Sequence, residues 1–132
     1  MLYRLSCILG LLFIVSSCFA STYNVQLNVI NKTGEAGYFS VAAQPVHPGS
    51  TSMSSMPQKI EPGFNRVFVP AYKFAYPVFT TMDEKAYTCG TQTDPKHQLF
   101  IPIGQGARTV VITGFITDKD GKKAAIDCKV GQ

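Results

Sequence analysis

Residues 23–29 read Tyr-Asn-Val-Gln-Leu-Asn-Val, and apolar and polar side chains alternate through the whole stretch. Successive side chains of a β-strand point to opposite faces, so the apolar residues share one face and the polar residues share the other. A half-buried strand explains this alternation, whereas a helix does not. The next residues, Asn-Lys-Thr-Gly at 31–34, end the pattern as a turn does.

Strand-like segments recur along the rest of the chain. Residues 108–117 (RTVVITGFIT) form the strongest of them, because Val, Ile, Thr and Phe fill the segment. Pro62-Gly63 and Asp120-Gly121 are turn signals between such segments. Pro77 and Pro102 indicate edge strands, a bulge or a strand end, because proline lacks the N–H that a central strand needs. The other expected strands are residues 38–43, 65–69, 74–81, 86–91, 98–103 and 123–130.

The spacing of these strands predicts the fold class. The chain has 132 residues, which allows one domain. Short strands with a turn signal every ten residues or so are typical of a sandwich or a small barrel. We expect an all-β fold, a small antiparallel β-sandwich of about 7–9 short strands that is immunoglobulin-like in size. The chain contains no Trp, so the expectation concerns the architecture and not the immunoglobulin family.

The first twenty residues have the layout of a secretory signal peptide. The first four residues carry a positive charge on Arg4. Residues 5–15 are apolar, and residues 16–20 are rich in small side chains. The apolar run is about half of the roughly 20 residues that a membrane-spanning helix needs. A short buried helix is the alternative, but it leaves the basic start and the small-residue end unexplained. We expect residues 1–20 to be a signal peptide and residues 21–132 to form one domain in the periplasm or outside the cell.

Two cleavage sites fit the end of this leader. Cys18-Phe19-Ala20 suits an ordinary signal peptidase that cuts before Ser21. Residues 15–18, Val-Ser-Ser-Cys, also resemble a bacterial lipobox, in which Cys18 carries the lipid and becomes the first residue. The ordinary cut is favoured, because Leu is more usual than Val in a lipobox. The alternative cut would make the protein an outer-membrane lipoprotein. The acyl chains on Cys18 would then hold it at the membrane, since each buried CH₂ adds about 0.8 kcal/mol of membrane affinity.

Two of the four cysteines, Cys89 and Cys128, lie beyond the leader. Cysteines of an exported domain usually pair, because that compartment is oxidising. No second Cys or His lies two to four residues from either one, which speaks against zinc. Residues 123–130 alternate, and the expected buried face carries Cys128 with Ala124, Ile126 and Val130. We therefore predict a disulfide that crosses the core.

The charge pattern excludes one class of partner. Without residues 1–20 the chain keeps eleven basic and eight acidic residues, a net charge of +3. The basic residues are dispersed, and no stripe of arginines and aromatic residues of the kind that binds nucleic acid is present. We expect no nucleic-acid partner, and a membrane partner only if Cys18 is lipidated.

Catalytic constellations are weak. The two histidines are His47 and His97, and the serines near His47 lack the strand–turn–helix context of a nucleophile. The neighbouring carboxylates, Asp83-Glu84 and the pair Asp118 and Asp120, occur where turns are expected. We expect that the protein is not an enzyme and needs no cofactor.

A copper site is the alternative. The polar loop of residues 45–57 carries His47, Met53 and Met56 in the pattern His-x₅-Met-x₂-Met. Imidazole and thioether ligands suit Cu(I), so the loop predicts a copper carrier as the competing function. The structural alternative is that the two methionines fix the loop to the sandwich.

Aromatic residues gather between residues 72 and 87. In a regular strand Tyr72, Phe74 and Tyr76 share one face, with Phe79 on the other. Unless both faces are covered, one aromatic set faces outward and can form a partner-binding surface; the alternative is that these residues belong to the core. We expect a binding or structural protein of the bacterial cell envelope or secreted fraction. Its interaction surface would be Tyr72, Phe74 and Tyr76, and its partner another envelope or extracellular protein.

Overall fold

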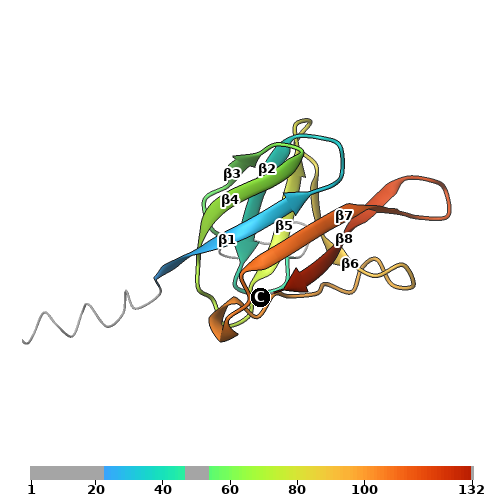
Figure 1. Ribbon diagram of the computed structural model, residues 1–132. Coiled ribbons are helices and arrows are strands. Elements are labelled where there is room, and N and C mark those ends of the chain that lie inside the picture. The colour runs from blue at the N-terminus through green and yellow to red at the C-terminus, as the bar shows by residue number, and fades with distance from the viewer. Residues whose placement is uncertain (1–22, 47–53, 132) are drawn as a thin grey trace, which may run out of the picture.

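The computed structural model describes residues 23–46 and 54–131, and it contains eight β-strands (Figure 1). The strands are β1 (Asn24–Asn31), β2 (Gly37–Ala42), β3 (Gln58–Ile60), β4 (Gly63–Pro70), β5 (Tyr76–Thr81), β6 (Ala86–Gly90), β7 (Thr109–Thr117) and β8 (Lys123–Gly131). One short 3₁₀ turn, η1 (Ile103–Gln105), precedes β7. The predicted all-β fold and its strand number are confirmed. Within the described ranges, no helix is long and apolar enough to cross a membrane.

The eight strands form one sheet in the order β3-β2-β5-β6-β8-β7-β1-β4. The sheet curls until it is nearly closed, and its two halves face each other across the core (Figure 1). Two neighbouring pairs are parallel, β1 with β7 and β6 with β8, and the other five pairs are antiparallel. The expected purely antiparallel pairing therefore holds for most of the sheet, while the parallel pairs join strands from distant parts of the chain.

The alternation in β1 determines what the core contains. Val25, Leu27 and Val29 are buried as the period of two predicts. Phe39 of β2 and Phe79 of β5 are paired on neighbouring strands in the other half of the sheet, and both side chains are fully buried. Large aromatic side chains buried in this way contribute most of the hydrophobic stabilisation of a small domain.

Pro77 lies inside the sheet, so the prediction of an edge strand at this position is wrong. β5 has β2 on one side and β6 on the other, and Pro77 is paired with Val41. The backbone N–H and C=O of Val41 bond to Ser55, away from β5. The pairing of β5 with β6 extends only from Val78 to Thr80, so Pro77 lies beyond its end and no ladder hydrogen bond is lost there.

The alternation expected in β8 is interrupted. Thr117 is paired with Lys123, whereas Ile116 is paired with Ala125, so Ala124 is an extra residue in the strand. Such a bulge reverses which side chains face the core. Ile126 is buried as predicted, but Ala125 is buried in place of Ala124, and Val130, which was also predicted to be buried, is exposed.

A glutamine side chain closes the gap between the two ends of the sheet, β3 and β4. The Gln58 carboxamide donates from Nε2 to the carbonyl oxygen of Phe68 at 2.7 Å, and its Oε1 accepts from the Phe68 N–H at 3.1 Å. The carboxamide thus takes the place of a peptide group in an antiparallel ladder. Without it, the backbone of Phe68 would lie at an open sheet edge.

Replacing this glutamine is expected to weaken the closure of the sheet. Gln58→Ala removes two hydrogen bonds that are accessible to water, so we expect a loss of about 1 kcal/mol in the free energy of unfolding, measured by urea denaturation. Gln92→Ala, at an exposed position of the loop after β6, is the control and is expected to leave the midpoint unchanged. Equal midpoints for the two variants would show that the bridge contributes nothing.

Candidate binding surface

The segment that leads into β5 has one buried and one outward face. The inward side chains, Ala75, Pro77 and Phe79, are all buried, as the alternation predicted. Of the predicted surface residues, Phe74 is 41% exposed and Tyr76 is half-buried. Tyr72 is also half-buried but packs against the core, so it contributes less to the surface than the other two.

The structure adds an aromatic residue, Phe100, to this surface. Ala75 and Ile101 exchange two backbone hydrogen bonds, of 3.3 and 2.7 Å, and so bring the two segments side by side. Phe100 then meets the rings of Phe74 and Tyr76, with centroids 5.0 and 5.9 Å apart and edge-to-face geometry. Such aromatic pairs contribute about 0.5–1.5 kcal/mol each beyond the burial of their area. Sequence reasoning missed Phe100, although its outward place between Leu99 and Ile101 was a usable signal.

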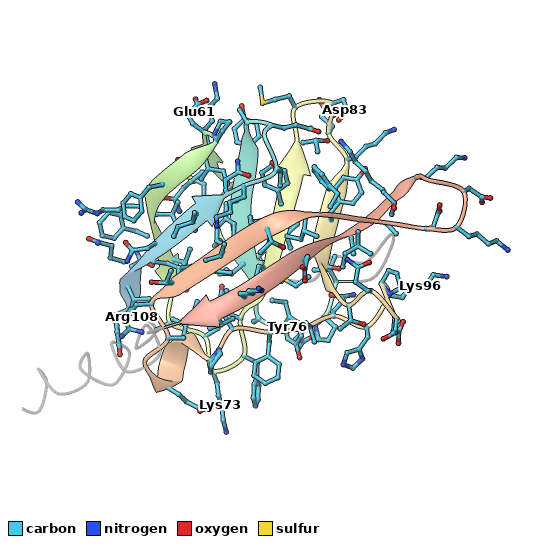
Figure 2. The ribbon with its side chains drawn as sticks, turned by 45° about the vertical axis from the view of Figure 1, so that its right-hand side comes forward. Glu61, Lys73, Tyr76, Asp83, Lys96 and Arg108 are labelled. Carbon is cyan, nitrogen blue, oxygen red and sulfur yellow. A yellow bond between two sulfur atoms is a disulfide. The ribbon has the colours of Figure 1, made fainter. Side chains whose placement is uncertain are left out.

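An apolar pocket of about 360 Å³ opens beside these rings. It is lined by Tyr76, Phe100 and Val130, by the two cysteines of the disulfide, and by the polar residues His97 and Gln98. Val130 is 44% exposed, although its pair partner on β7, Val110, is fully buried. Figure 2 shows Tyr76 at the lower edge of the molecule, where its ring points away from the sheet. A concave, mostly apolar site with a few polar groups is the usual form of a site that receives an apolar group.

The disulfide supports this pocket. Cys89 and Cys128 are joined as predicted, with Cα atoms 5.6 Å apart. The bond does not cross the core, because it links the neighbouring strands β6 and β8. These strands share only the pairs Cys89 with Ile126 and Gly90 with Asp127, so the bond reinforces the shortest junction in the sheet.

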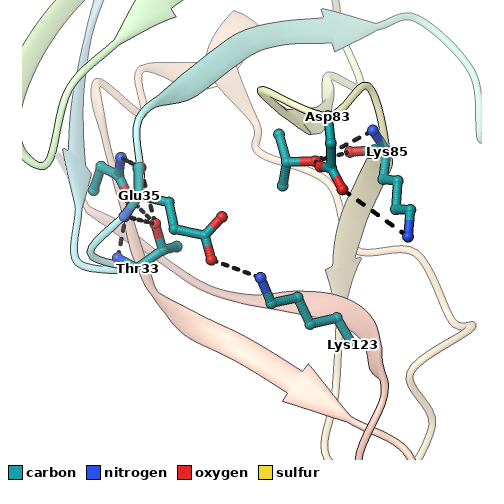
Figure 3. A network of polar contacts seen from close by, with 7 residues as sticks. Thr33, Glu35, Asp83, Lys85 and Lys123 are labelled. Carbon is teal, nitrogen blue, oxygen red and sulfur yellow. Dashed lines mark hydrogen bonds and ion pairs between the residues drawn. The ribbon is translucent and has the colours of Figure 1, made fainter.

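The charged side chains at the opposite end stabilise turns. Lys123 donates a hydrogen bond of 2.6 Å to Glu35 (Figure 3). Its ammonium group also lies 4.1 Å from the centre of the Phe115 ring. The bond to Glu35 raises the pKa of Lys123. The Thr81 hydroxyl donates to Asp83 and lowers the pKa of that carboxyl. The Lys123–Glu35 bond joins the start of β8 to the β1–β2 turn, whereas the Thr81–Asp83 bond lies within the β5–β6 turn.

The predicted copper ligands are mostly outside the described residues, as is Cys18. His47 and Met53 belong to the undescribed loop, and Met56 alone is described, with a side chain 82% exposed. In residues 23–46 and 54–131, no three His, Cys, Asp or Glu side chains gather in a group that could hold a metal ion. Copper binding stays a prediction.

Comparison with known proteins gives no relative: no protein-family model, curated protein or solved structure matches this chain. A function must therefore be inferred from the aromatic surface and its pocket. Three aromatic rings and an apolar pocket lie together there, on segments fixed by backbone pairing and a disulfide.

Proposed function

We propose that this chain is an exported, non-enzymatic binding protein that receives an apolar side chain of another envelope or extracellular protein. The pocket beside Phe100 carries the proposal, because Tyr76 and Phe100 line an apolar hollow and the Phe74 ring packs against Phe100. Aromatic residues that flank a pocket are the usual energetic centre of a protein interface. Lys73, whose ammonium group lies 5.4 Å from the centre of the Phe74 ring, adds a polar rim.

Export of the chain rests on two observations. Residues 1–20 have the layout of a signal peptide, and the Cys89–Cys128 bond is of the kind that persists in oxidising compartments. The intact mass of protein purified from its own host tests this point. A mass that begins at Ser21, or at an acylated Cys18, supports export, whereas a mass that begins at Met1 with free thiols contradicts it.

Binding through the pocket is tested by photo-crosslinking. A photoreactive phenylalanine analogue at position 100 is expected to capture a partner in the host envelope, whereas the same analogue at position 82, in the β5–β6 turn, does not. The affinity of the purified partner should fall at least about 30-fold for Phe100→Ala, the loss typical of an interface hot spot.

Met82→Ala, at a side chain that is 55% exposed, is the matched control and should bind as the native chain does. Urea denaturation of each variant separates lost binding from lost folding. Equal affinity of the folded Phe100→Ala variant and the native chain would exclude the pocket as the binding site.

A further inference from the structure

A second aromatic surface lies on the outer face of β4. Val67 and Val69 point into the core, so Phe64, Arg66 and Phe68 point outward. Both phenylalanines are 58% exposed, and the guanidinium group of Arg66 lies 5.5 Å from the centre of the Phe64 ring. Large apolar side chains grouped on the surface of a small domain mark a site of interaction.

This surface continues to the start of β1. A shallow hollow of about 380 Å³ lies between Asn24, Met56 and Phe68, and the Met56 side chain is almost entirely exposed. Residues Met56, Phe64, Arg66 and Phe68 are called the β4 strip below. The strip is separate from the pocket beside Phe100, since the two hollows share no lining residue.

Residues 54–70, which contain the β4 strip, carry two basic side chains and one acidic side chain, a net charge of +1. The acidic side chain is Glu61, and its carboxylate lies 3.6 Å from the ammonium group of Lys59. Residues 23–31 contain no acidic side chain. The β7–β8 hairpin, which carries Asp118 and Asp120, projects on the opposite side of the molecule from the start of β1 (Figure 1). The strip thus faces away from these carboxylates and complements a negatively charged surface.

The chain also leaves the described fold beside this strip. Tyr23 precedes β1, next to Asn24 in the wall of the hollow. Tyr23 is five positions after Cys18, a distance of at most about 18 Å when fully extended. A lipid on Cys18, or the apolar leader itself, would therefore bring this end of the domain close to a bilayer.

We propose that the β4 strip is a docking surface for a lipid bilayer that contains anionic lipids. Exposed phenylalanine side chains can be buried at the boundary between headgroups and acyl chains, and a basic side chain is attracted to an anionic lipid surface. The strip combines both kinds of side chain on the face from which the chain leads to its apolar leader. The proposal concerns a different face from the proposed partner site and does not depend on it.

Because the chain has no tryptophan, a single introduced Trp reports on its own surroundings. Phe68→Trp places the reporter in the strip, and Met82→Trp places it in the β5–β6 turn, at a side chain of similar exposure beside Asp83 and Glu84. Both variants keep the native N-terminus, so any contribution of residues 1–22 is common to both. The probes are vesicles of phosphatidylglycerol mixed with phosphatidylcholine, and vesicles of phosphatidylcholine alone.

With the anionic vesicles, the emission of Phe68→Trp is expected to shift to shorter wavelength and that of Met82→Trp to stay unchanged. Adding Arg66→Gln to Phe68→Trp should weaken the partitioning about fivefold. An unchanged spectrum of Phe68→Trp, or the same shift in both variants, would overturn the proposal. A shift that needs no vesicles and grows with protein concentration would also overturn it, and would assign the strip to a second copy of the chain.

Discussion

Replacing both cysteines, Cys89→Ser with Cys128→Ser, is expected to lower the free energy of unfolding by about 4 kcal/mol. The bond joins residues 39 apart in the sequence, and it restricts the unfolded chain by closing that loop. The melting temperature should fall by about 15 °C, given the unfolding entropy typical of a domain of this size. Such a loss is a large part of the stability that small domains possess.

The location of the bond explains why this effect should not be offset elsewhere. β6 and β8 share only two residue pairs, although they connect the two halves of the sheet. Cys89 is 1% exposed, so a serine hydroxyl in its place would also be buried. We expect the junction between β6 and β8 to open first when the bond is absent.

Reduction of the native chain provides the control, because it breaks the bond without changing any other atom of the core. The reduced native chain and the serine variant should lose stability together, with the variant lower by the cost of burying a hydroxyl. Urea denaturation with and without reductant measures both. If complete reduction, verified by mass, left the urea midpoint unchanged, the bond would have no stabilising role.

The alternating segments made the fold class and most of the core predictable from sequence. Val25, Leu27 and Val29 in β1, and Ala75 and Phe79 around β5, are buried where the period of two placed them. The buried face of a strand can be predicted in this way because it is determined by the alternation of apolar and polar residues within that strand.

Features that depend on strand neighbours were not predictable. Ala124 became an extra residue because the β7–β8 ladder shifts its register, and no residue type announces such a shift. The bridge between Ala75 and Ile101 brought Phe100 to Phe74. The candidate pocket is therefore a product of pairing between distant segments, of which the sequence indicated only the aromatic residues before β5.

Gly37 at the start of β2 is expected to tolerate no side chain. A Cβ atom there would lie 2.5 Å from the carbonyl oxygen of Thr80 and 2.7 Å from the Cζ atom of Phe79. The first atom belongs to the backbone of β5, which pairs with β2 at this point, and the second to a fully buried ring. Gly37→Ala should therefore lower the free energy of unfolding by about 2–3 kcal/mol, in the range of overpacked cores.

Gly114 in β7 provides the matched control. A Cβ atom there meets no other atom within 4 Å, so Gly114→Ala introduces no contact. Because alanine restricts the unfolded chain more than glycine does, this variant should gain about 0.5 kcal/mol. Urea denaturation of both variants then tests whether close approach, rather than loss of glycine as such, determines the outcome. A Gly37→Ala variant as stable as Gly114→Ala would show that β2 and β5 are not packed as closely as described.

A double variant separates the two contacts of the added methyl group. Phe79→Leu removes the ring atoms near Gly37 and leaves the Thr80 carbonyl oxygen in place. If the ring carries part of the clash, the losses in Gly37→Ala with Phe79→Leu should be less than additive, by about 0.5–1 kcal/mol. Strict additivity would assign the whole effect to the backbone of β5. In both cases, glycine at position 37 is required by the short distance between β2 and β5, since its backbone conformation is open to any residue.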